Sequence, residues 1–527
     1  MNGIDSNRAA AVALETVADI AAATVENRPT GALTVTGISL DSHAVEAGWI
    51  FAALPGTRVH GAAFAESSEA TAILTDHAGW DILAQAGETR PVLVVDDVRA
   101  ILGPVSAEIH GNPSDKLTVI GVTGTSGKTT TTYMLEAGLS AAGCAVGLIG
   151  TTGTRIKGED VPTSLTTPEA PKLQELFALM VDRGVTHVVM EVSSHALVLG
   201  RVTGTAFDVA GFTNLSQDHL DFHPTMEDYF DAKAMLFDRQ SSLAAKTSVI
   251  CVDDEWGERM VRRAAEGASE GESVVVTVGT HGQAHLECEA TLNGTTDSGA
   301  QDITVRLRGI EIDARLPLPG AFNVANAALA TAIADAAGID AAEFLNGLTG
   351  AAVPGRMERI DAGQEFVAVV DYAHKPAAIA AALDSLREQV DGRVGIVVGA
   401  GGDRDQSKRA VMGAESARRA DLVIVTDDNP RTEDPTAIRA AVLAGAEEAA
   451  GEPGQVEIRE SDSRADAIRQ LVAWARPGDA VIVVGKGHEV GQIIGGVTHH
   501  FDDREEMRAA LAHAGFGAKA TAKEDRA

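Results

Sequence analysis

The sequence has few cysteines, few aromatic residues, few positive charges and no long apolar run, and these shortages exclude several classes of protein. Cys144, Cys251 and Cys288 lie far apart without CxxC or metal-ligand spacing, which argues against a disulfide framework and for a reducing compartment. Lysine and arginine number 43 against 75 acidic residues, so the formal charge of −32 would repel a nucleic-acid backbone or an anionic bilayer. No apolar run reaches the ~18 residues of a spanning helix, and the N-terminus lacks the basic stretch of a signal peptide. We therefore expect a cytoplasmic protein with no membrane span and no nucleic-acid partner.

The length and two clusters of turn-forming residues predict three domains. A chain of 527 residues is too long for one hydrophobic core, since single cores stop growing near ~250 to 300 residues. The clusters HGNPS at 110–114 and VPGR at 353–356 each precede a new apolar strand. We place the domains at residues 1–113, 114–355 and 356–527.

The order of apolar runs predicts an α/β fold in each domain. Short runs at 72–74 and 92–95 indicate a small α/β first domain. Strands and helices alternate through the second domain, which is typical of a mostly parallel, doubly wound sheet, with an antiparallel rim expected at 270–316. In the third domain, runs at 366–371, 394–399, 422–425 and 480–485 predict four buried strands of a Rossmann-like sheet.

The strongest single motif is a phosphate-binding loop after a predicted strand at 117–122. Its glycines allow backbone N–H groups to close around a phosphate, and the helix that follows adds the positive end of its dipole. The motif departs from the strict G-x-x-x-x-G-K-[ST] pattern, because Val122 stands where the first glycine is expected. The loop residues are Gly124, Thr125, Ser126, Gly127, Lys128, Thr129 and Thr130.

Two further segments place acidic residues and histidines at strand ends. Glu191 closes an apolar strand, and the carboxyl ends of parallel strands are where functional groups gather, so its carboxylate can bind Mg²⁺ beside a phosphate. The segment TNLSQDHLDFH at 213–223 is dense in Asp, Asn and His, a density that favours a functional cleft. Lys233, by contrast, has the spacing of an ordinary solvated helix lysine.

Six motifs in order identify a resemblance to a known family. They are GTSGKTT at 124–130, EVSSHAL at 191–197, NLSQDHLDFH at 214–223, GAFNVAN at 320–326, DYAHKP at 371–376 and DDNPR at 427–431. In this order they resemble the Mur ligases over nearly the whole chain, and among these the group that extends UDP-MurNAc-L-Ala-D-Glu. The resemblance implies three domains that bind the UDP-sugar, ATP and an incoming amino acid in turn.

The resemblance also implies roles for individual residues at an ATP and magnesium site. Lys128 is expected to contact the ATP phosphates, Thr129 and Glu191 to bind one Mg²⁺, and His219 a second. Lys233 is expected to be carbamylated and to bind that second ion, which overrides the solvated-lysine interpretation. Lys128, Lys233 and His219 are the expected catalytic residues. Further ATP contacts are expected from Asn323, Asn326, Arg356, Asp371 and His374, and no organic prosthetic group is expected.

The remaining site residues are expected to bind the two other substrates. Contacts to the UDP-MurNAc-dipeptide are implied for Leu40, Ser42, Thr166, Thr167, Ser193 and Arg201. In the third domain, Arg404 and Arg431 could hold a carboxylate and Glu489 an ammonium group, although Arg431 could also be a surface residue of a proline turn. The implied amino-acid site comprises Arg404, Asp428, Asn429, Arg431, Gly485 and Glu489.

The implied reaction is ATP-dependent amide-bond formation in peptidoglycan biosynthesis. The Asn-Pro-Arg sequence at 429–431 resembles enzymes that add meso-diaminopimelate to the D-Glu γ-carboxylate through an acyl phosphate. L-Lysine and L-ornithine stay open as alternative acceptors, and a folylpolyglutamate synthetase-like ligase is the enzymatic rival. A regulatory nucleotide-binding protein that has lost catalysis would lack Glu191, His219 or Lys233, and all three are present. We expect a monomer.

Overall fold

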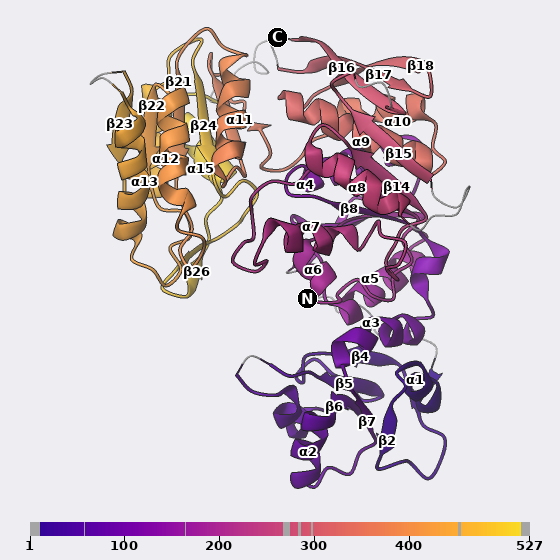
Figure 1. Ribbon diagram of the computed structural model, residues 1–527. Coiled ribbons are helices and arrows are strands. Elements are labelled where there is room, and N and C mark those ends of the chain that lie inside the picture. Colours follow the sequence, from indigo (N-terminus) through magenta and orange to yellow (C-terminus); the bar gives the residue numbers. More distant parts are fainter. Residues whose placement is uncertain are drawn as a thin grey trace, which may run out of the picture. The chain divides into compact units, whose positions relative to one another are not determined.

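The structure is a computed structural model that describes residues 11–56, 58–163, 165–266, 274–282, 286–296, 299–451 and 455–517. Contacts between Cα atoms divide the chain into two units. The first comprises residues 1–290, 305–312 and 325–347, and the second comprises residues 291–304, 313–324 and 348–527. Each unit is described separately (Figure 1).

The first unit begins with a five-stranded sheet, drawn in indigo in Figure 1. Its order is β2-β7-β6-β5-β4, and β4 to β7 run parallel while β2 is antiparallel. The strands β5, β6 and β7 are mostly apolar and almost wholly buried, as expected for a parallel sheet with helices on its faces. The strands are β2 (Thr24–Glu26), β4 (Gly37–Ser39), β5 (Trp49–Ala53), β6 (Ala72–Asp76) and β7 (Val92–Val95), and α1 (Leu14–Ile20), α2 (His77–Gln85) and α3 (Val98–Ile109) accompany them.

A second sheet carries the phosphate loop and is mostly parallel, as predicted. Its order is β11-β10-β9-β12-β8-β13-β14-β15-β16-β17-β18. The strands are β8 (Thr118–Thr123), β9 (Val146–Gly150), β10 (Gly153–Ile156), β11 (Glu159–Val161), β12 (His187–Glu191), β13 (Val209–Phe212), β14 (Thr247–Cys251), β15 (Val274–Gly279), β16 (Cys288–Thr295), β17 (Gln301–Leu307) and β18 (Ile310–Leu316). The helices are α4 (Lys128–Ala141), α5 (Ala170–Asp182), α6 (Ser194–Val198), α7 (Met226–Ala234), α8 (Glu255–Ala265), α9 (Ala321–Ala336) and α10 (Ala341–Gly347).

The antiparallel rim predicted for residues 270–316 is wrong for its first strand pair, β15 with β16. Strand β15 pairs parallel with β14, and β16 pairs parallel with β15. Helix α8 lies between β14 and β15 in the sequence and returns the chain to the starting edge, which makes a parallel pairing possible. The Thr- and Val-rich composition therefore indicated strands correctly but carried no information on their direction.

The second unit contains a six-stranded sheet of order β19-β20-β24-β21-β22-β23. Strands β20 to β24 are parallel, and β19 is antiparallel to β20. Alternate apolar side chains enter two cores, one against α11 to α13 and the other against α14 and α15. The strands are β19 (Glu358–Arg359), β20 (Val367–Asp371), β21 (Val394–Val398), β22 (Leu422–Val425), β23 (Glu457–Glu460) and β24 (Ala480–Val484), followed by the hairpin β25 (Gln492–Ile494) and β26 (Val497–His499). The helices are α11 (Pro376–Arg387), α12 (Lys408–Arg419), α13 (Pro435–Ala449), α14 (Arg464–Trp474) and α15 (Asp503–His513).

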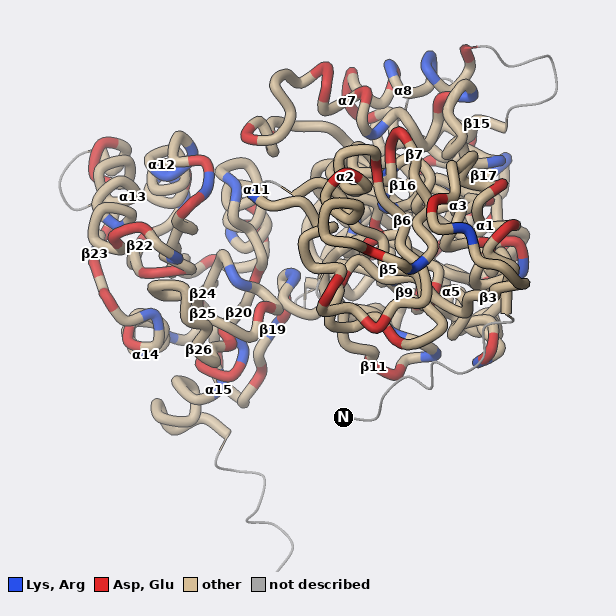
Figure 2. The backbone as a smooth tube through the Cα atoms, turned by 90° about the horizontal axis from the view of Figure 1, so that it is seen from below, with Lys and Arg blue, Asp and Glu red and all other residues tan. Residues whose placement is uncertain are grey.

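The four strands predicted for this sheet are confirmed, but its two edge strands, β19 and β23, were missed. The sequence of β23, EIRE, has no apolar run, because it is a half-exposed edge strand. Figure 2 shows acidic and basic positions interspersed along the described chain. Among the described residues, no helix combines the length and apolar character that crossing a bilayer requires.

Candidate functional site

The phosphate loop has the backbone geometry that its glycines predict. Gly124 and Gly127 have φ values of +144° and +88°, in the region that favours glycine, and α4 begins directly after them. A Cβ atom on Gly127 would lie 2.5 Å from Oδ1 of Asn326, so this side chain lies against the loop. The amino end of α4 and the loop N–H groups therefore form an anion-binding arrangement.

Two lysines meet at the carbonyl oxygen of Gly124. Lys128 Nζ donates a hydrogen bond to this oxygen at 2.9 Å and another to Thr125 O at 3.1 Å. Lys233 Nζ donates to the same Gly124 oxygen at 2.8 Å and lies 4.5 Å from the centre of the Tyr229 ring. The Lys233 side chain is 1% exposed, so it is not the solvated helix lysine that its spacing alone suggested.

Glu191 is the buried acceptor at the centre of the site. Its carboxylate accepts a hydrogen bond from Thr129 Oγ1 at 2.9 Å. Thr151 donates two more, from its N–H at 2.8 Å and from its hydroxyl at 3.0 Å. The predicted neighbours Thr129 and Glu191 are thus in direct contact, and Thr151 orients the carboxylate.

The Asp- and His-rich segment forms an aromatic cluster beside Tyr229. The His195 ring stacks on Phe222 at 4.1 Å and meets the rings of His219 and His223 edge-on at 4.9 and 5.7 Å. His219 lies 5.9 Å from Tyr229, which also carries Lys233 on its face, so the two residues predicted for a second metal are neighbours of one ring. Burial lowers the pKa of His195 and of His223, so both favour the neutral, metal-compatible form.

The oxygen donors at this site fit Mg²⁺ bound beside phosphates. Mg²⁺ prefers oxygen ligands and is usually held by one or two protein groups together with water and substrate phosphates. Thr129 and Glu191 supply such oxygens next to the anion-binding loop. In the described part of the chain, no three His, Cys, Asp or Glu side chains form a preformed metal cluster.

The residues predicted to bind the UDP-MurNAc-dipeptide fall into two groups within the first unit. Thr167 Oγ1 donates to the Glu191 carbonyl oxygen at 2.9 Å and accepts from the Ser193 N–H at 3.2 Å, while Thr166 Oγ1 donates to Thr151 Oγ1 at 3.3 Å. This group therefore adjoins Glu191. Arg201 forms an ion pair with Glu169 at 2.8 Å. Leu40 and Ser42 follow β4 in the first sheet.

In the second unit, three residues predicted at the ATP site surround Tyr372. The Arg356 guanidinium lies 4.4 Å from the centre of the Tyr372 ring, and His374 Nδ1 lies 2.9 Å from the Tyr372 carbonyl oxygen. Asp371 accepts hydrogen bonds from the N–H groups of Met357 and Ala373, both at 2.7 Å. Burial raises the pKa of Asp371 although the Arg356 charge opposes this. The amide of Asn323, also in this unit, donates to Pro319 O at 2.7 Å.

Most residues predicted to bind the amino acid converge at the carboxyl ends of β22 and β24. Asn429 Nδ2 donates to Glu489 Oε2 at 3.0 Å. Gly485 has φ +118°, and a Cβ atom there would lie 3.1 Å from Oδ2 of Asp428. Asp428, Asn429, Gly485 and Glu489 are therefore brought together by the sheet.

Arg404 and Arg431 flank the glycine pair that follows β21. A Cβ atom on Gly401 would lie 3.3 Å from Arg431 Nη1 and 3.9 Å from Arg404 Cγ. Arg431 Nη1 donates to Gly402 O at 2.6 Å, and its backbone, with φ +55°, bonds to β25 through Ile493. Arg404 is exposed. Arg431 is thus built into the fold rather than displayed on a free turn.

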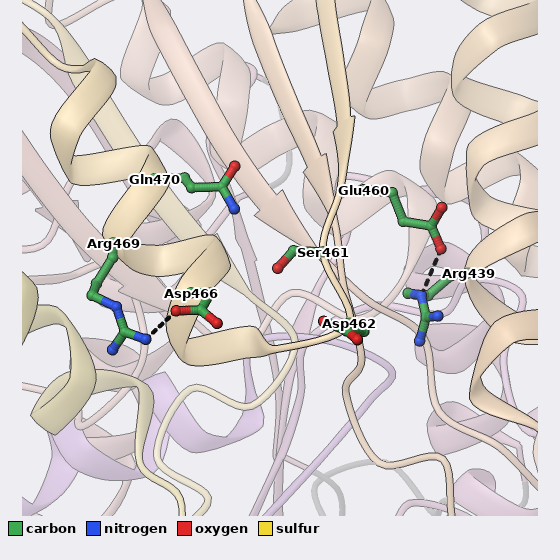
Figure 3. Close-up of a pocket in the computed structure, with 7 residues that line it drawn as sticks. All are labelled: Arg439, Glu460, Ser461, Asp462, Asp466, Arg469 and Gln470. Carbon is green, nitrogen blue, oxygen red and sulfur yellow. Dashed lines mark hydrogen bonds and ion pairs between the residues drawn. The ribbon is translucent and has the colours of Figure 1, made fainter.

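A cavity of about 580 Å³ in the second unit is lined by other residues. Figure 3 shows four of its charged side chains in pairs, Arg439 with Glu460 and Arg469 with Asp466. Its lining residues are Arg439, Glu460, Ser461, Asp462, Asp466, Arg469 and Gln470, and none of them was predicted to bind a substrate. We do not place the amino acid there.

Comparisons with known proteins agree with this geometry. Three family profiles match in order: "Mur ligase family, catalytic domain" at residues 34–109, "Mur ligase middle domain" at 122–334 and "Mur ligase, glutamate ligase domain" at 355–487. A UDP-N-acetylmuramoyl-L-alanyl-D-glutamate--2,6-diaminopimelate ligase of Corynebacterium glutamicum is 62% identical over 487 residues, covering 91% of this chain and 92% of its own. The chain belongs to the Mur ligase family.

Two solved structures have folds similar to that of this chain. A UDP-N-acetylmuramoyl-L-alanyl-D-glutamate--2,6-diaminopimelate ligase superposes with a TM-score of 0.65 at 32% identity, covering 92% of this chain and 96% of its own. A Mycobacterium tuberculosis folylpolyglutamate synthase complexed with ADP and AMPPCP gives 0.58 at 21% identity, covering 72% and 91%. The second likeness shows a shared fold alone.

Three residues in contact with the site of this Mur ligase were missed in the sequence. Thr151 follows β9 and Lys486 follows β24, so the rule that functional groups gather at the carboxyl ends of parallel strands could have identified both. Tyr229, whose ring carries Lys233, lies inside a helix and gave no such signal.

Proposed function

We propose that this Mur ligase adds meso-diaminopimelate to the D-Glu γ-carboxylate of UDP-MurNAc-L-Ala-D-Glu in peptidoglycan biosynthesis, with cleavage of ATP to ADP and phosphate. The proposal is carried by the presence of two sites in the same chain. One contains Lys128, Lys233 and Glu191. The other brings together, at one sheet edge, Asp428, Asn429, Arg431 and Glu489. The 62% identical relative named for this reaction supports the choice of acceptor.

The proposal includes a division into three functional domains, at residues 1–113, 114–355 and 356–527. The separate five-stranded, eleven-stranded and six-stranded sheets and the three successive family matches support these boundaries. The first would bind the uridine end of the UDP-sugar through Leu40 and Ser42, the second ATP, and the third the amino acid.

The first chemical step activates a carboxylate. An oxygen of the D-Glu γ-carboxylate attacks the γ-phosphorus of ATP, the bond to the bridging oxygen breaks, and ADP leaves an acyl phosphate behind. The loop N–H groups and the Lys128 ammonium stabilise the negative charge that gathers on the phosphates. Bound Mg²⁺, of which we propose two ions, would supply further charge neutralisation. Thr129 and Glu191 would hold one ion, and His219 with carbamylated Lys233 the other.

The second step forms the amide bond. A neutral amine of the acceptor attacks the acyl carbon, phosphate leaves, and the amine loses a proton. Arg404 and Arg431 would hold a carboxylate of the acceptor, and Asp428 and Glu489 its ammonium group. Because water would hydrolyse the acyl phosphate, the site must be closed during both steps. We propose that the enzyme works as a cytoplasmic monomer.

A product assay tests the acceptor. Purified protein is incubated with UDP-MurNAc-L-Ala-D-Glu, ATP and Mg²⁺, and with meso-diaminopimelate, L-lysine or L-ornithine in separate reactions. We expect stoichiometric ADP, phosphate and tripeptide product with meso-diaminopimelate. Faster turnover with L-lysine or L-ornithine would contradict the proposal.

The rival from the same fold is a folylpolyglutamate synthetase-like ligase. The first sheet, matched by the Mur ligase catalytic-domain profile at 34–109, favours a UDP-sugar over a folate. Replacing the UDP-sugar by a reduced folate and the acceptor by L-glutamate separates the two, because only a folate ligase would form a glutamylated folate.

A further inference from the structure

Lys486 is a lysine that cannot reach a substrate directly. It follows β24, and its side chain is 0% exposed. Its ammonium group donates hydrogen bonds to Gly491 O at 2.6 Å and to Asn429 Oδ1 at 3.0 Å. A buried ammonium group is costly unless it is paired and hydrogen-bonded, so these bonds fix the segment 486–491 against Asn429.

The contact with Lys486 also determines which way the Asn429 amide faces. An ammonium group only donates hydrogen bonds, so it can face only the oxygen of the amide. The same oxygen accepts a second bond, from the N–H of Ile493 at 3.0 Å. The Asn429 nitrogen must then point away, where it donates to Glu489 Oε2 at 3.0 Å. Lys486 therefore orients Glu489 through Asn429.

Lys486 lies close to two carboxylates. Lys486 Nζ lies 3.4 Å from Asp428 Oδ1 and 3.9 Å from Glu489 Oε2. Within the described part of the chain, the buried Oδ1 atom of Asp428 accepts no hydrogen bond, whereas the Glu489 side chain is 37% exposed. Lys486 keeps the two carboxylates together, and the charge of Arg464 acts on both of them while the charge of Arg431 acts on Glu489. The exposed part of Glu489 is the part that an incoming ammonium group can contact. Burial and the charge of Asp428 raise the pKa of Glu489, and the charge of Lys486 opposes this.

We propose that Lys486 is the positioning residue of the amino-acid site: it holds Asn429, Asp428 and Glu489 in the arrangement that receives an ammonium group of the acceptor. This inference rests on the proposed function, because it assumes that the acceptor binds at the carboxyl ends of β22 and β24. Lys486 acts through its neighbours and does not contact the reacting atoms.

The test compares kinetic constants of Lys486→Met with those of a matched variant. Methionine keeps an unbranched apolar stem but removes the ammonium group. We expect the KM for meso-diaminopimelate to rise about 10- to 100-fold, the range produced by loss of a supporting partner of a binding group, with the KM for ATP changed less than about twofold. Arg393→Met is the control, because Arg393 pairs with Asp479 at 2.6 Å at the opposite, amino-terminal edge of the same sheet.

The possible outcomes distinguish a positioning role of Lys486 from a general contribution of Lys486 to the stability of the protein. If Lys486→Met lowers the melting temperature like Arg393→Met and leaves every KM unchanged, or raises the KM for ATP equally, the inference is overturned. Lys486→Gln, which keeps an N–H donor, should give an intermediate KM and provides the comparison if the methionine variant does not fold. If the wild-type enzyme used L-lysine but not meso-diaminopimelate, the proposed acceptor would be refuted. The change in the KM for L-lysine caused by Lys486→Met would then decide the role of Lys486.

Discussion

Lys128 and Lys233 donate hydrogen bonds to the same carbonyl oxygen, that of Gly124, at 2.9 and 2.8 Å. Two ammonium groups that converge on one acceptor repel each other, and burial of Lys233 weakens the screening of that repulsion by water. Addition of carbon dioxide to the Lys233 amine would replace a cation by an anionic carbamate and turn repulsion into attraction. The geometry thus supplies a physical reason for the carbamylation that we propose.

Replacement of Lys233 by alanine tests this role. Lys233→Ala should lower kcat by about 100-fold or more, the scale of losing one preorganised electrostatic group in an active site. Acetate or formate should restore part of the activity by placing a carboxylate in the vacated space. Lys246→Ala is the control, since Lys246 is exposed and pairs only at the surface with Asp208. Wild-type activity of Lys233→Ala without added carboxylate would remove Lys233 from the mechanism.

Thr151 should tune metal binding by orienting Glu191. Thr151→Val removes the hydroxyl that donates to Glu191 Oε2 at 3.0 Å and leaves a buried carboxylate with one bond fewer. We expect the Mg²⁺ concentration for half-maximal activity to rise about 10-fold, as for other partners of metal ligands.

The matched control for Thr151 is Thr154→Val. Thr154 is buried whereas Thr151 is partly buried, and the Thr154 hydroxyl pairs with that of Thr163 at 3.1 Å rather than with Glu191. Titration of Mg²⁺ in both variants separates orientation of Glu191 from loss of a threonine hydroxyl. Equal Mg²⁺ dependence in the two variants would show that Thr151 has no special role.

The phosphate loop could be predicted because all of its information is local. Within residues 117–130 a predicted strand is followed by the glycines, the lysine and the start of a helix. The tolerance of glycine for positive φ values alone determines the turn. Lys233 could not be predicted from its residues. Helical spacing does not report which face of α7 the rest of the fold covers, and only packing places this lysine under the Gly124 carbonyl. The family resemblance, not the local pattern, identified it.

The proposed amino-acid site could be predicted only in part. The sequence shows polar side chains near strand ends at Asp428, Asn429 and Glu489. Lys486, three residues before Glu489, also follows a strand, but the sequence does not show that its side chain is wholly buried. Strand β23 was missed because edge strands lack the apolar run on which the other strand predictions depended.

His110 should make the stability of the first unit depend on pH. Burial, together with the nearby charge of Lys172, lowers the pKa of His110 from 6.5 to about 4. Between these values the unfolded chain binds a proton that the folded chain does not, so the free energy of unfolding should rise with pH from about 4 to 6.5. Its contribution is complete above pH 6.5 and is lost as the pH falls, by at most about 1.4 kcal/mol per pH unit.

Urea unfolding at several pH values in this window checks the contribution of His110. His110→Gln should flatten the pH dependence relative to the wild type. His77→Gln is the control, because the His77 side chain is 71% exposed and pairs with the fully exposed Asp96. If the two variants showed the same pH dependence as the wild type, the buried imidazole would not be the linked group.

The ion pair between Arg464 and Asp503 should be the most sensitive electrostatic contact of the second unit. Both side chains are 0% exposed, and the guanidinium donates two hydrogen bonds to the carboxylate, each at 2.7 Å. Arg464 also donates to the Val484 carbonyl oxygen at 2.8 Å, directly before Gly485 and Lys486. Asp503→Asn leaves a buried guanidinium without its counter-charge and should lower the free energy of unfolding by about 3 to 5 kcal/mol.

The fluorescence of Trp474, on the same helix as Arg464, reports unfolding of this unit in urea. The control is Asp466→Asn, which breaks an exposed pair with Arg469 on that helix and should change the free energy by less than about 1 kcal/mol. The double variant Arg464→Met with Asp503→Leu should recover part of the loss, because apolar residues of similar volume often replace a buried pair without cost. Recovery should stay incomplete, since the Val484 carbonyl then lacks its donor and the loop that carries Lys486 loses its support. Equal destabilisation by Asp503→Asn and Asp466→Asn would show that the buried pair contributes no more than a surface pair.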